Sequence, residues 1–386
     1  MIKNSSLQDY IFIVVVALMA IGAVFVFSAG ADISQQISPQ NFYRFPALRQ
    51  LLFFPLAVMV MLAFSFFDYH KLSFDKGIEK SPSTYLLGIS IILITLVLIP
   101  ALGTEVNYAR RWLRIPFGAF SLNFQPSELA KWSMIFFLAA FCDFYNESLH
   151  FYRERFIPIC LLIGLVAGLI LIEDFGTAAL ITLISFIILF IAGAKITHML
   201  SLAPVGILAF CVALFSSKAR MDRIAAFFHP EEHADTASYQ ANQSLIAMGS
   251  GNVWGKGLGK GICKYGHLPE DTTDFIFSII GEEMGLVGTI TVIVLFIAFL
   301  VLGFMVIARC KDRLGRYLAC GIVLVISIQA ALNIGVVTVV LPTKGIPLPF
   351  VSSGGTSLLV SAAAIGLLLN IAKQLPEPAS KEKRHG

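Results

Sequence analysis

The residues best suited to chemistry lie in residues 265–285, where an acidic segment runs directly into a strongly apolar one. Glu270, Asp271 and Asp274 lie in the acidic part. A carboxylate at the point where a loop enters a membrane is costly to keep and is usually functional. Asp274 is the best placed to act as a base on a lipid-linked substrate, close to head groups and partly shielded from water. The alternative is that Asp274 caps a helix or interacts with its dipole.

Ionisable residues also occur within apolar segments. Glu282 and Glu283 follow Asp274 by about two helical turns and favour a functional cavity, although Asp274 and Glu282 would share a side of an ideal helix only loosely. Glu128 and Lys131 open another apolar segment and share one helical face, because they are three residues apart. They predict an ion pair, and a site role as well, because ionisable groups inside a span usually face a cavity or the bundle interior.

Clustered arginines are candidate partners for an anion. Arg110, Arg111 and Arg114 fall within five residues. Arginine forks match phosphate geometry, as in a diphosphate head group. The other interpretation is anchoring to anionic lipid heads, helped by Trp112 at the interface. The residues alone favour neither interpretation.

Two segments between apolar stretches carry polar residues with weaker signals. Glu173 and Asp174 precede the sequence Phe-Gly-Thr in a tight turn, and we interpret them as solvated turn carboxylates. Residues 249–261, GSGNVWGKGLGKG, are rich in glycine, which lets a backbone turn tightly or approach a ligand. Their spacing is too irregular for a nucleotide-binding loop, and no predicted strand precedes them.

Residues 338–357, TVVLPTKGIPLPFVSSGGTS, mix prolines, glycines and hydroxyls between two apolar segments. Irregular backbone near membrane depth is tolerated only where protein or a watery cavity satisfies its polar groups. We predict a re-entrant loop that lines a site, with Lys344 as a cation and Ser352 as a donor. An ordinary surface loop is the alternative.

The elements that must position these residues follow from the composition. Of 386 residues, 57% are hydrophobic and only 13% are charged, with a mean hydropathy of +0.81. Such a chain lacks the polar surface of a soluble domain. We predict an all-α polytopic membrane protein. Its ten apolar segments lie near residues 10–29, 47–67, 84–102, 127–144, 156–172, 176–193, 198–215, 274–308, 317–340 and 354–373.

The basic residues predict the orientation of these segments. Lysines and arginines are more frequent in the loops on the side of the termini, which places both termini in the cytoplasm. The first segment reads as a retained span. One large outer loop, about 216–273, contains Arg220 and Arg223. Residues 1–373 then form one membrane domain, and residues 374–386 form a disordered tail. The six cysteines have no disulfide or metal-type spacing.

Seven segments in this order resemble the SEDS family of membrane proteins (shape, elongation, division and sporulation). They are NYARRW (107–112), FQPSELAK (124–131), DFGTA (174–178), YQANQSLIAMGSG (239–251), GLGKG (257–261), LPEDTTDFIFSIIGEE (268–283) and LPTKGIPLPFVSSGGTS (341–357). The chain departs from the family pattern at Glu173, where proline is usual, at Asn252, where glycine is common, and at Ser353, where tyrosine is common.

The resemblance implies a glycosyltransferase that polymerises peptidoglycan, with Asp274 at the position of the essential catalytic aspartate. Asp274 would take the proton from the 4-hydroxyl of lipid II as this acceptor attacks the anomeric carbon of a glycan on polyprenyl diphosphate, with inversion. Glu128 and Lys131 would line the same cavity, where they would support the site or contact the substrate. The leaving diphosphate would be stabilised by a divalent cation such as Mg²⁺ or Mn²⁺, for which no ligands are identified, or by Arg110, Arg111, Arg114, Arg220 or Arg223.

The resemblance also implies partners and a location. The family acts at the outer face of the bacterial inner membrane with a class B penicillin-binding protein, a transpeptidase, and a division-type member would join other divisome proteins. No nucleic-acid partner is expected. Lys344 within PTKGIPLPF favours the division branch over the elongation branch. The main rival function is a flippase that moves lipid II across the membrane, and a scaffold for division proteins is a third reading.

Overall fold

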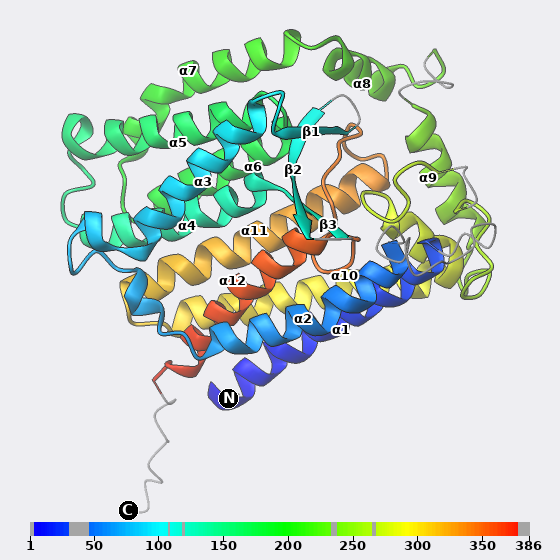
Figure 1. Ribbon diagram of the computed structural model, residues 1–386, viewed down its shortest axis with the longest axis horizontal. Coiled ribbons are helices and arrows are strands. Elements are labelled where there is room, and N and C mark those ends of the chain that lie inside the picture. Colours follow the sequence, from blue (N-terminus) through cyan, green and yellow to red (C-terminus); the bar gives the residue numbers. More distant parts are fainter. Residues whose placement is uncertain are drawn as a thin grey trace, which may run out of the picture.

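The computed structural model describes residues 4–30, 46–106, 109–117, 120–232, 238–264 and 268–376. Helices dominate this part of the chain (Figure 1). The α-helices are α1 (Asn4–Gly30), α2 (Pro46–Ser65), α3 (Pro82–Leu98), α4 (Pro126–Phe144), α5 (Ile157–Leu171), α6 (Phe175–Ile191), α7 (Ile196–Phe215), α8 (Lys218–Phe228), α9 (Tyr239–Ser250), α10 (Ile276–Arg309), α11 (Arg313–Val337) and α12 (Gly355–Lys373). Short helical turns at Tyr69–Leu72, Ile78–Lys80 and Tyr152–Phe156 join some of them.

The apolar segments predicted from the sequence all fall on helices. Within the described residues, seven helices are long and apolar enough to cross a membrane, and α3 and α6 are shorter apolar helices. In a bilayer, a helix satisfies every backbone N–H and C=O internally, so apolar runs of this length fold as helices. The chain is therefore a multi-pass membrane protein, and the count of ten crossings stays a prediction.

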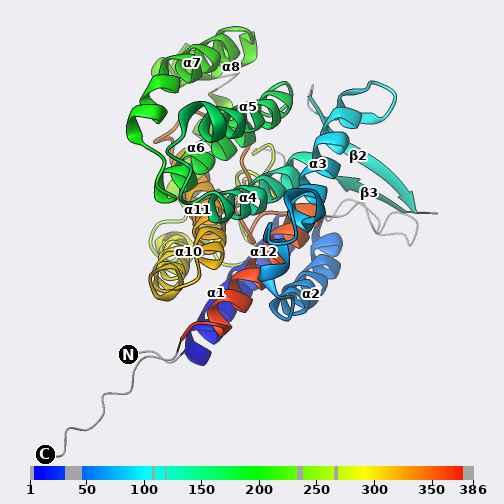
Figure 2. The same ribbon diagram turned by 90° about the vertical axis from the view of Figure 1, so that its left-hand side faces the viewer.

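Helix α4 forms the centre of the bundle. It packs against α3, α6, α11 and α12, and nearly all its residues from Pro126 to Cys142 are buried. Figure 2 shows α4 between the α5–α6 layer and α12. By contrast, α7 packs weakly against α6 and α8 and exposes most of its apolar side chains. This arrangement places the charged residues of α4 inside protein, whereas α7 faces outward.

A three-stranded antiparallel sheet interrupts the helical pattern between α3 and α4. Its strands, in the order β1–β2–β3, are β1 (Gly103–Val106), β2 (Ala109–Phe117) and β3 (Phe120–Phe124). The all-α prediction missed this sheet, because its strands are short and the charged run in β2 read as a loop. The register shifts between Thr104 and Glu105, so Arg111 has no partner on β1. Such a bulge redirects the strand locally.

The longest predicted apolar segment, near residues 274–308, corresponds to α10 and is broken at Gly285. Gly285 has φ 64° and ψ −155°, a conformation that glycine adopts without the steric cost of a side chain. The region predicted as a large loop contains α8 and α9. Of the predicted disordered tail, residues 377–386 lie outside the described residues.

The bundle has two distinct ends. The start of α1 and the end of α12 lie together at one end, as Figures 1 and 2 both show. The Lys373 ammonium lies 5.4 Å from the centroid of the Phe66 ring at this end. The sheet and the connection from α11 to α12 lie toward the opposite end (Figure 1). The candidate site residues gather at that opposite end.

Candidate functional site

Asp274 lies in the turn that leads into α10, just before the apolar span that begins at Ile276. The N-cap position of α10 is occupied by Phe275, which makes no side-chain capping bond. The N-cap residue of α10 is therefore Phe275 and not Asp274, and an interaction of Asp274 with the helix dipole stays a prediction. Its side chain lies close to the next loop of the site, because a Cβ added at Gly345 would come within 2.8 Å of the Asp274 Oδ2 atom.

Hydrogen bonds to three consecutive carbonyl groups, those of residues 272–274, hold the backbone around Asp274. Each accepts a hydrogen bond from the region between α11 and α12 or from α11 itself. The donors are Ser353 N to Thr272 O (2.8 Å), Ser352 Oγ to Thr273 O (2.5 Å) and Asn333 Nδ2 to Asp274 O (2.8 Å). Because all three bonds converge on one turn, the loop before α12 sets the position of Asp274.

Two amides on α11 connect this loop to the helices. Asn333 is buried and also donates to the carbonyl of Ile346 (2.7 Å), and Gln329 donates to that of Pro347 (3.0 Å). The sequence analysis missed both residues. The signal that could have found them is a pair of amides four residues apart on one face of an apolar helix, since polar groups inside a span are rarely idle.

Asn333 should position Asp274. We expect Asn333→Leu to reduce the kcat of the enzyme by about tenfold with little change in KM, because the variant still binds substrate but loses the donor to Asp274 O. Two carbonyls then lack their bond, which lowers the free energy of unfolding by about 1–3 kcal/mol each. Steady-state kinetics and thermal unfolding in detergent measure both effects.

A matched control is Asn370→Leu, because Asn370 is a buried amide in α12 that donates to Ser65 O (2.8 Å). It should lower the stability in the same way and leave kcat unchanged. Equal loss of kcat in both variants would show that Asn333 acts only through general stability.

Asp174 is buried, which corrects the prediction of a solvated turn carboxylate. Its oxygens accept from Thr177 N (3.1 Å) and Thr177 Oγ1 (2.8 Å), so it caps α6. The turn is buried because Lys344 and the start of β2 cover it. A Cβ added at Gly176 would come within 2.8 Å of the Lys344 Cε atom and 3.2 Å of Asp174 Oδ1, so the Lys344 side chain lies close to this turn.

The other carboxylate of this turn, Glu173, holds the strand β2. Its Oε2 atom accepts from Arg110 N (2.7 Å), and its backbone carbonyl accepts from Arg111 Nε (2.8 Å). The prediction that Glu173 is a solvated turn carboxylate is therefore also corrected, because Glu173 connects the turn before α6 to the sheet. This contact brings the Arg111 guanidinium to the site.

Arg111 and Arg223 surround Asp274 with positive charge, and Asp174 adds negative charge. The pKa of the Asp274 carboxyl is raised to about 7, chiefly because burial disfavours its charged form; Glu270 and Asp174 raise it further, and Arg111 and Arg223 oppose the shift. A pKa near neutrality suits a base, since the carboxylate is available and still basic enough to accept a proton.

Cations near the site are themselves partly desolvated. Burial lowers the pKa of the Arg223 guanidinium and the pKa of the Lys344 ammonium. The negative charge of Asp174 partly offsets this by raising the pKa of Lys344. The Lys344 ammonium lies 4.8 Å from the centroid of the Phe175 ring, and the Arg220 guanidinium lies 5.3 Å from it. Cations in such surroundings gain strongly from an anionic ligand.

Two of the predicted arginines have other contacts, and a third is exposed. Arg110 forms an ion pair with Glu105 (3.2 Å), and Arg114 is exposed on β2. Arg220 donates to the carbonyls of Ala213 (2.6 Å) and Leu171 (3.1 Å), which joins α8 to the ends of α7 and α5. The structure thus brings Arg111, Arg223 and Lys344 closest to Asp174 and Asp274.

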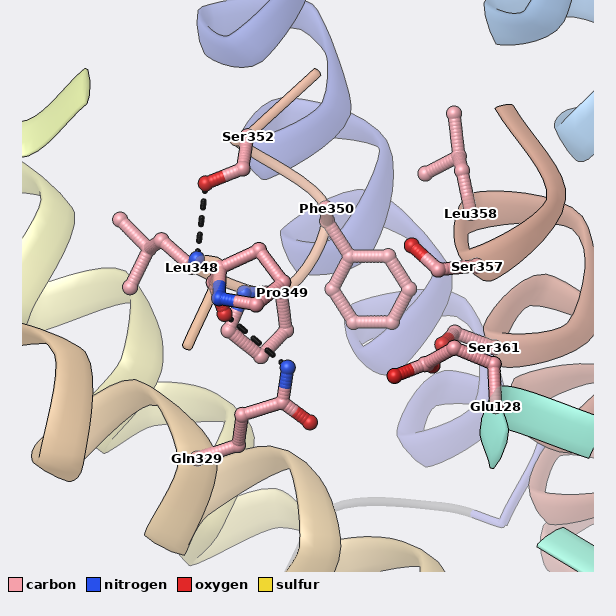
Figure 3. A pocket seen from close by; sticks show the side chains of 10 residues that line it. Glu128, Gln329, Leu348, Pro349, Phe350, Ser352, Ser357, Leu358 and Ser361 are labelled. Carbon is pink, nitrogen blue, oxygen red and sulfur yellow. Dashed lines mark hydrogen bonds between the residues drawn. The ribbon is translucent and has the colours of Figure 1, made fainter. Parts of the chain in front are cut away.

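The Glu128–Lys131 ion pair forms as predicted, with 2.8 Å between Lys131 Nζ and Glu128 Oε2. Lys131 also donates to Gln329 Oε1 (3.0 Å), and both charged side chains are buried. Glu128 lines a small cavity of about 20 Å³ with the loop before α12 and with Ser352, Ser357 and Ser361, drawn in Figure 3. The size fits about one water molecule. Ser352 connects this cavity to the turn of Asp274.

Glu282 and Glu283, predicted to favour a functional cavity, hold the glycine-rich loop (residues 251–264) instead. Glu282 accepts from Lys256 Nζ (2.7 Å) and from two backbone N–H groups of the loop. Glu283 accepts from Lys264 Nζ (2.9 Å) and Ser28 Oγ (2.8 Å). Of the two roles predicted for the glycines, the structure supports tight turning against these carboxylates.

The described residues contain no group of three or more His, Cys, Asp or Glu side chains that could hold a metal ion. A Mg²⁺ ion is usually held by one or two carboxylates together with substrate phosphates.

The fold and the site define a multi-pass membrane protein. Its site contains a carboxyl with a pKa near neutrality, that of Asp274, and arginines nearby that could bind a phosphate group. The family FTSW_RODA_SPOVE, described as cell cycle protein, matches residues 8–377. The chain therefore belongs to the SEDS family.

Among its relatives, a probable peptidoglycan glycosyltransferase FtsW of Trichlorobacter lovleyi is 36% identical over 97% of this chain and 96% of its own length. Stage V sporulation protein E of Bacillus subtilis is 36% identical over 96% of this chain and 98% of its own length. Among solved structures, a chain described under "Structural coordination of polymerization and crosslinking by a peptidoglycan synthase complex" matches with a TM-score of 0.72. It is 25% identical and covers 94% of this chain and 96% of its own length.

Proposed function

We propose that this protein is a peptidoglycan glycosyltransferase that polymerises lipid II into glycan strands. The observation that carries this proposal is the Asp274 carboxyl, whose pKa is about 7 and which interacts electrostatically with Arg111 and Arg223 just before an apolar span. A base and phosphate-suited cations beside a membrane are what transfer between lipid diphosphates requires. The names of the FtsW relatives support the same activity.

In the proposed reaction, Asp274 accepts the proton of the 4-hydroxyl of lipid II. The hydroxyl oxygen forms a bond to the anomeric carbon of the glycan donor on the opposite side from the leaving group, so the configuration inverts. The bond from that carbon to the diphosphate oxygen breaks, and its electron pair leaves with polyprenyl diphosphate. The proton stays on Asp274 until it is lost to solvent or to the leaving group.

The leaving diphosphate gains negative charge and needs nearby donors. Arg111, Arg223 and Lys344 supply them in this proposal, because burial has already removed part of their water. Arg110, Arg114 and Arg220 contribute through long-range charge. Mg²⁺ or Mn²⁺ would bind through the diphosphate, and no step here depends on it.

The proposed setting is the bacterial inner membrane, with both termini in the cytoplasm and Asp274 at the outer face. The support is the excess of basic residues in the segments predicted on the side of the two termini, which include Lys71, Arg313, Arg316 and Lys373. If glycan is polymerised at the outer face, a transpeptidase on that side of the membrane can reach the product.

The proposed partner is a class B penicillin-binding protein, supported by the similarity to a chain from a complex of polymerisation and crosslinking. Septal synthesis with other divisome proteins is the proposed process, and the FtsW names and Lys344 support it. A role in cell elongation is the alternative. The sporulation relative of equal identity makes depletion in cells the decisive test: filaments support division, and round cells support elongation.

The activity is tested with purified protein in detergent, supplied with lipid II with and without its transpeptidase. Glycan strands that are resolved by gel electrophoresis support the polymerase. A flippase needs no base and would instead move labelled lipid II between leaflets of liposomes without forming glycan. Flipping without polymerisation, in the presence of the transpeptidase, would refute the proposal.

The polymerisation rate should rise with pH through about 7 and level off above it. Asp274 acts only when deprotonated, and its raised pKa keeps it protonated at lower pH, so the rate falls about tenfold per pH unit on the acid side. Glu270→Gln removes a charge that raises this pKa and should move the acid limb to lower pH. Arg223→Gln should move it to higher pH. Shifts in the same direction for both variants would contradict the assignment.

A further inference from the structure

The glycine-rich loop presents apolar side chains to its surroundings although it belongs to no predicted span. Trp254 is 80% exposed, and Val253, Leu258 and Ile262 are also exposed. An exposed tryptophan among aliphatic side chains is unusual on a loop that faces only water. We therefore expect these exposed side chains to contact an apolar partner.

The loop is joined to the lipid-facing surface of α10 at the break. Leu286 N donates to Asn252 O (2.9 Å), and Val287 N donates to Val253 O (3.2 Å). In return, the carbonyls of Glu282 and Glu283 accept from the loop backbone. Leu286 and Val287 have exposed apolar side chains, so the patch of the loop continues the apolar surface of α10.

The length of α10 beyond the break at Gly285 places the break at the boundary of the membrane. The stretch from Leu286 to Arg309 rises about 1.5 Å per residue and measures about 36 Å. The hydrocarbon core needs only about 30 Å. Gly285 and the loop bound to it therefore lie where acyl chains meet head groups.

The carboxylates that hold the loop lie inside the protein. Glu282 and Glu283 are buried and neutralised by Lys256 and Lys264, and they accept several backbone N–H groups of the loop. Irregular backbone near membrane depth is tolerated when protein satisfies it in this way. A Cβ at Gly255 (φ 77°) would collide with the Glu283 carbonyl, which fixes the tight turn that exposes Trp254.

We propose that the glycine-rich loop is an interfacial anchor that inserts Val253, Trp254, Leu258 and Ile262 into the acyl–head-group boundary of the leaflet at the Asp274 end. Tryptophan prefers this depth, and Lys260, an exposed cation of the same loop, suits anionic head groups. Because the same loop binds Glu282 and Glu283, about two turns beyond Asp274, the anchor sets the depth of Asp274 relative to the lipid surface.

The test is fluorescence quenching of the full-length protein in liposomes. Trp254 is one of three tryptophans, so its emission is obtained by subtracting that of Trp254→Phe from that of the unchanged protein. With phosphatidylcholine brominated near the head group, we expect this difference to fall about twofold or more, and aqueous iodide should reduce it little. Trp132, 1% exposed inside the bundle, is the control: the same subtraction with Trp132→Phe should show no effect of bromine.

Two outcomes would overturn the anchor. Quenching of Trp254 by iodide and not by brominated lipid would place the loop in water. Loss of the bromine effect on adding the transpeptidase would assign the patch to a protein interface. Neither outcome bears on the proposed polymerase activity, which the glycan assay measures separately.

Discussion

Replacing Asp274 by asparagine should lower the rate of glycan polymerisation by about 100- to 10,000-fold, the usual contribution of a positioned base. Asparagine has nearly the same shape but cannot take a proton. The bond from Asn333 reaches the backbone carbonyl of residue 274, so the variant keeps that contact and should fold. Gel analysis of glycan made from lipid II measures the rate, and thermal unfolding in detergent checks the fold.

The matched control is Asp271→Asn, which makes the same chemical change three residues earlier. Burial also raises the pKa of Asp271, to about 6, but the charged groups that act on this carboxyl are Glu270, which raises the pKa, and Lys264, which lowers it. The Asp271→Asn variant should polymerise at close to the normal rate. An active Asp274→Asn protein, or an inactive Asp271→Asn protein with normal stability, would refute the catalytic assignment.

The second large effect concerns the buried ion pair of α4. We expect Lys131→Met to lower the free energy of unfolding by about 3–5 kcal/mol, because it leaves the Glu128 carboxylate buried without its partner. Gln329 Oε1 also loses its donor. The measurement is unfolding in mixed detergent, followed by circular dichroism.

The double variant Glu128→Gln, Lys131→Met tests the cause. It removes both charges, so it should recover more than half of the stability lost in Lys131→Met. If the double variant is as unstable as the single one, lost packing and not an uncompensated charge explains the effect. Polymerisation by the stable double variant then separates a structural role of the pair from contact with substrate.

Local features were predictable because local patterns determine them. Apolar runs locate the helices, since the bilayer leaves few other ways to satisfy a backbone. The spacing of Glu128 and Lys131 was enough to predict their ion pair, because residues three apart share a helical face. By contrast, the short strands that carry Arg111 lack an apolar period, and the sheet was missed.

The surroundings of Asp274 depend on contacts distant in the chain. Asp174 seemed a solvated turn residue until packing buried it against the groups around Lys344. Glu282 and Glu283 pointed to a cavity, yet they hold the glycine-rich loop, because the break at Gly285 lets that loop pair with α10.

Sequence patterns alone were enough to identify the class of protein, the helical segments, the family and Asp274 as the residue to test. Which charges meet at Asp274 depends instead on how distant elements pack together. Arg111 comes from β2, Arg223 from α8 and Asp174 from the start of α6, and Asn333 on α11 holds the turn. The physical reason is that periodicity reports contacts within one helix or strand, whereas contacts between elements follow from how their faces pack.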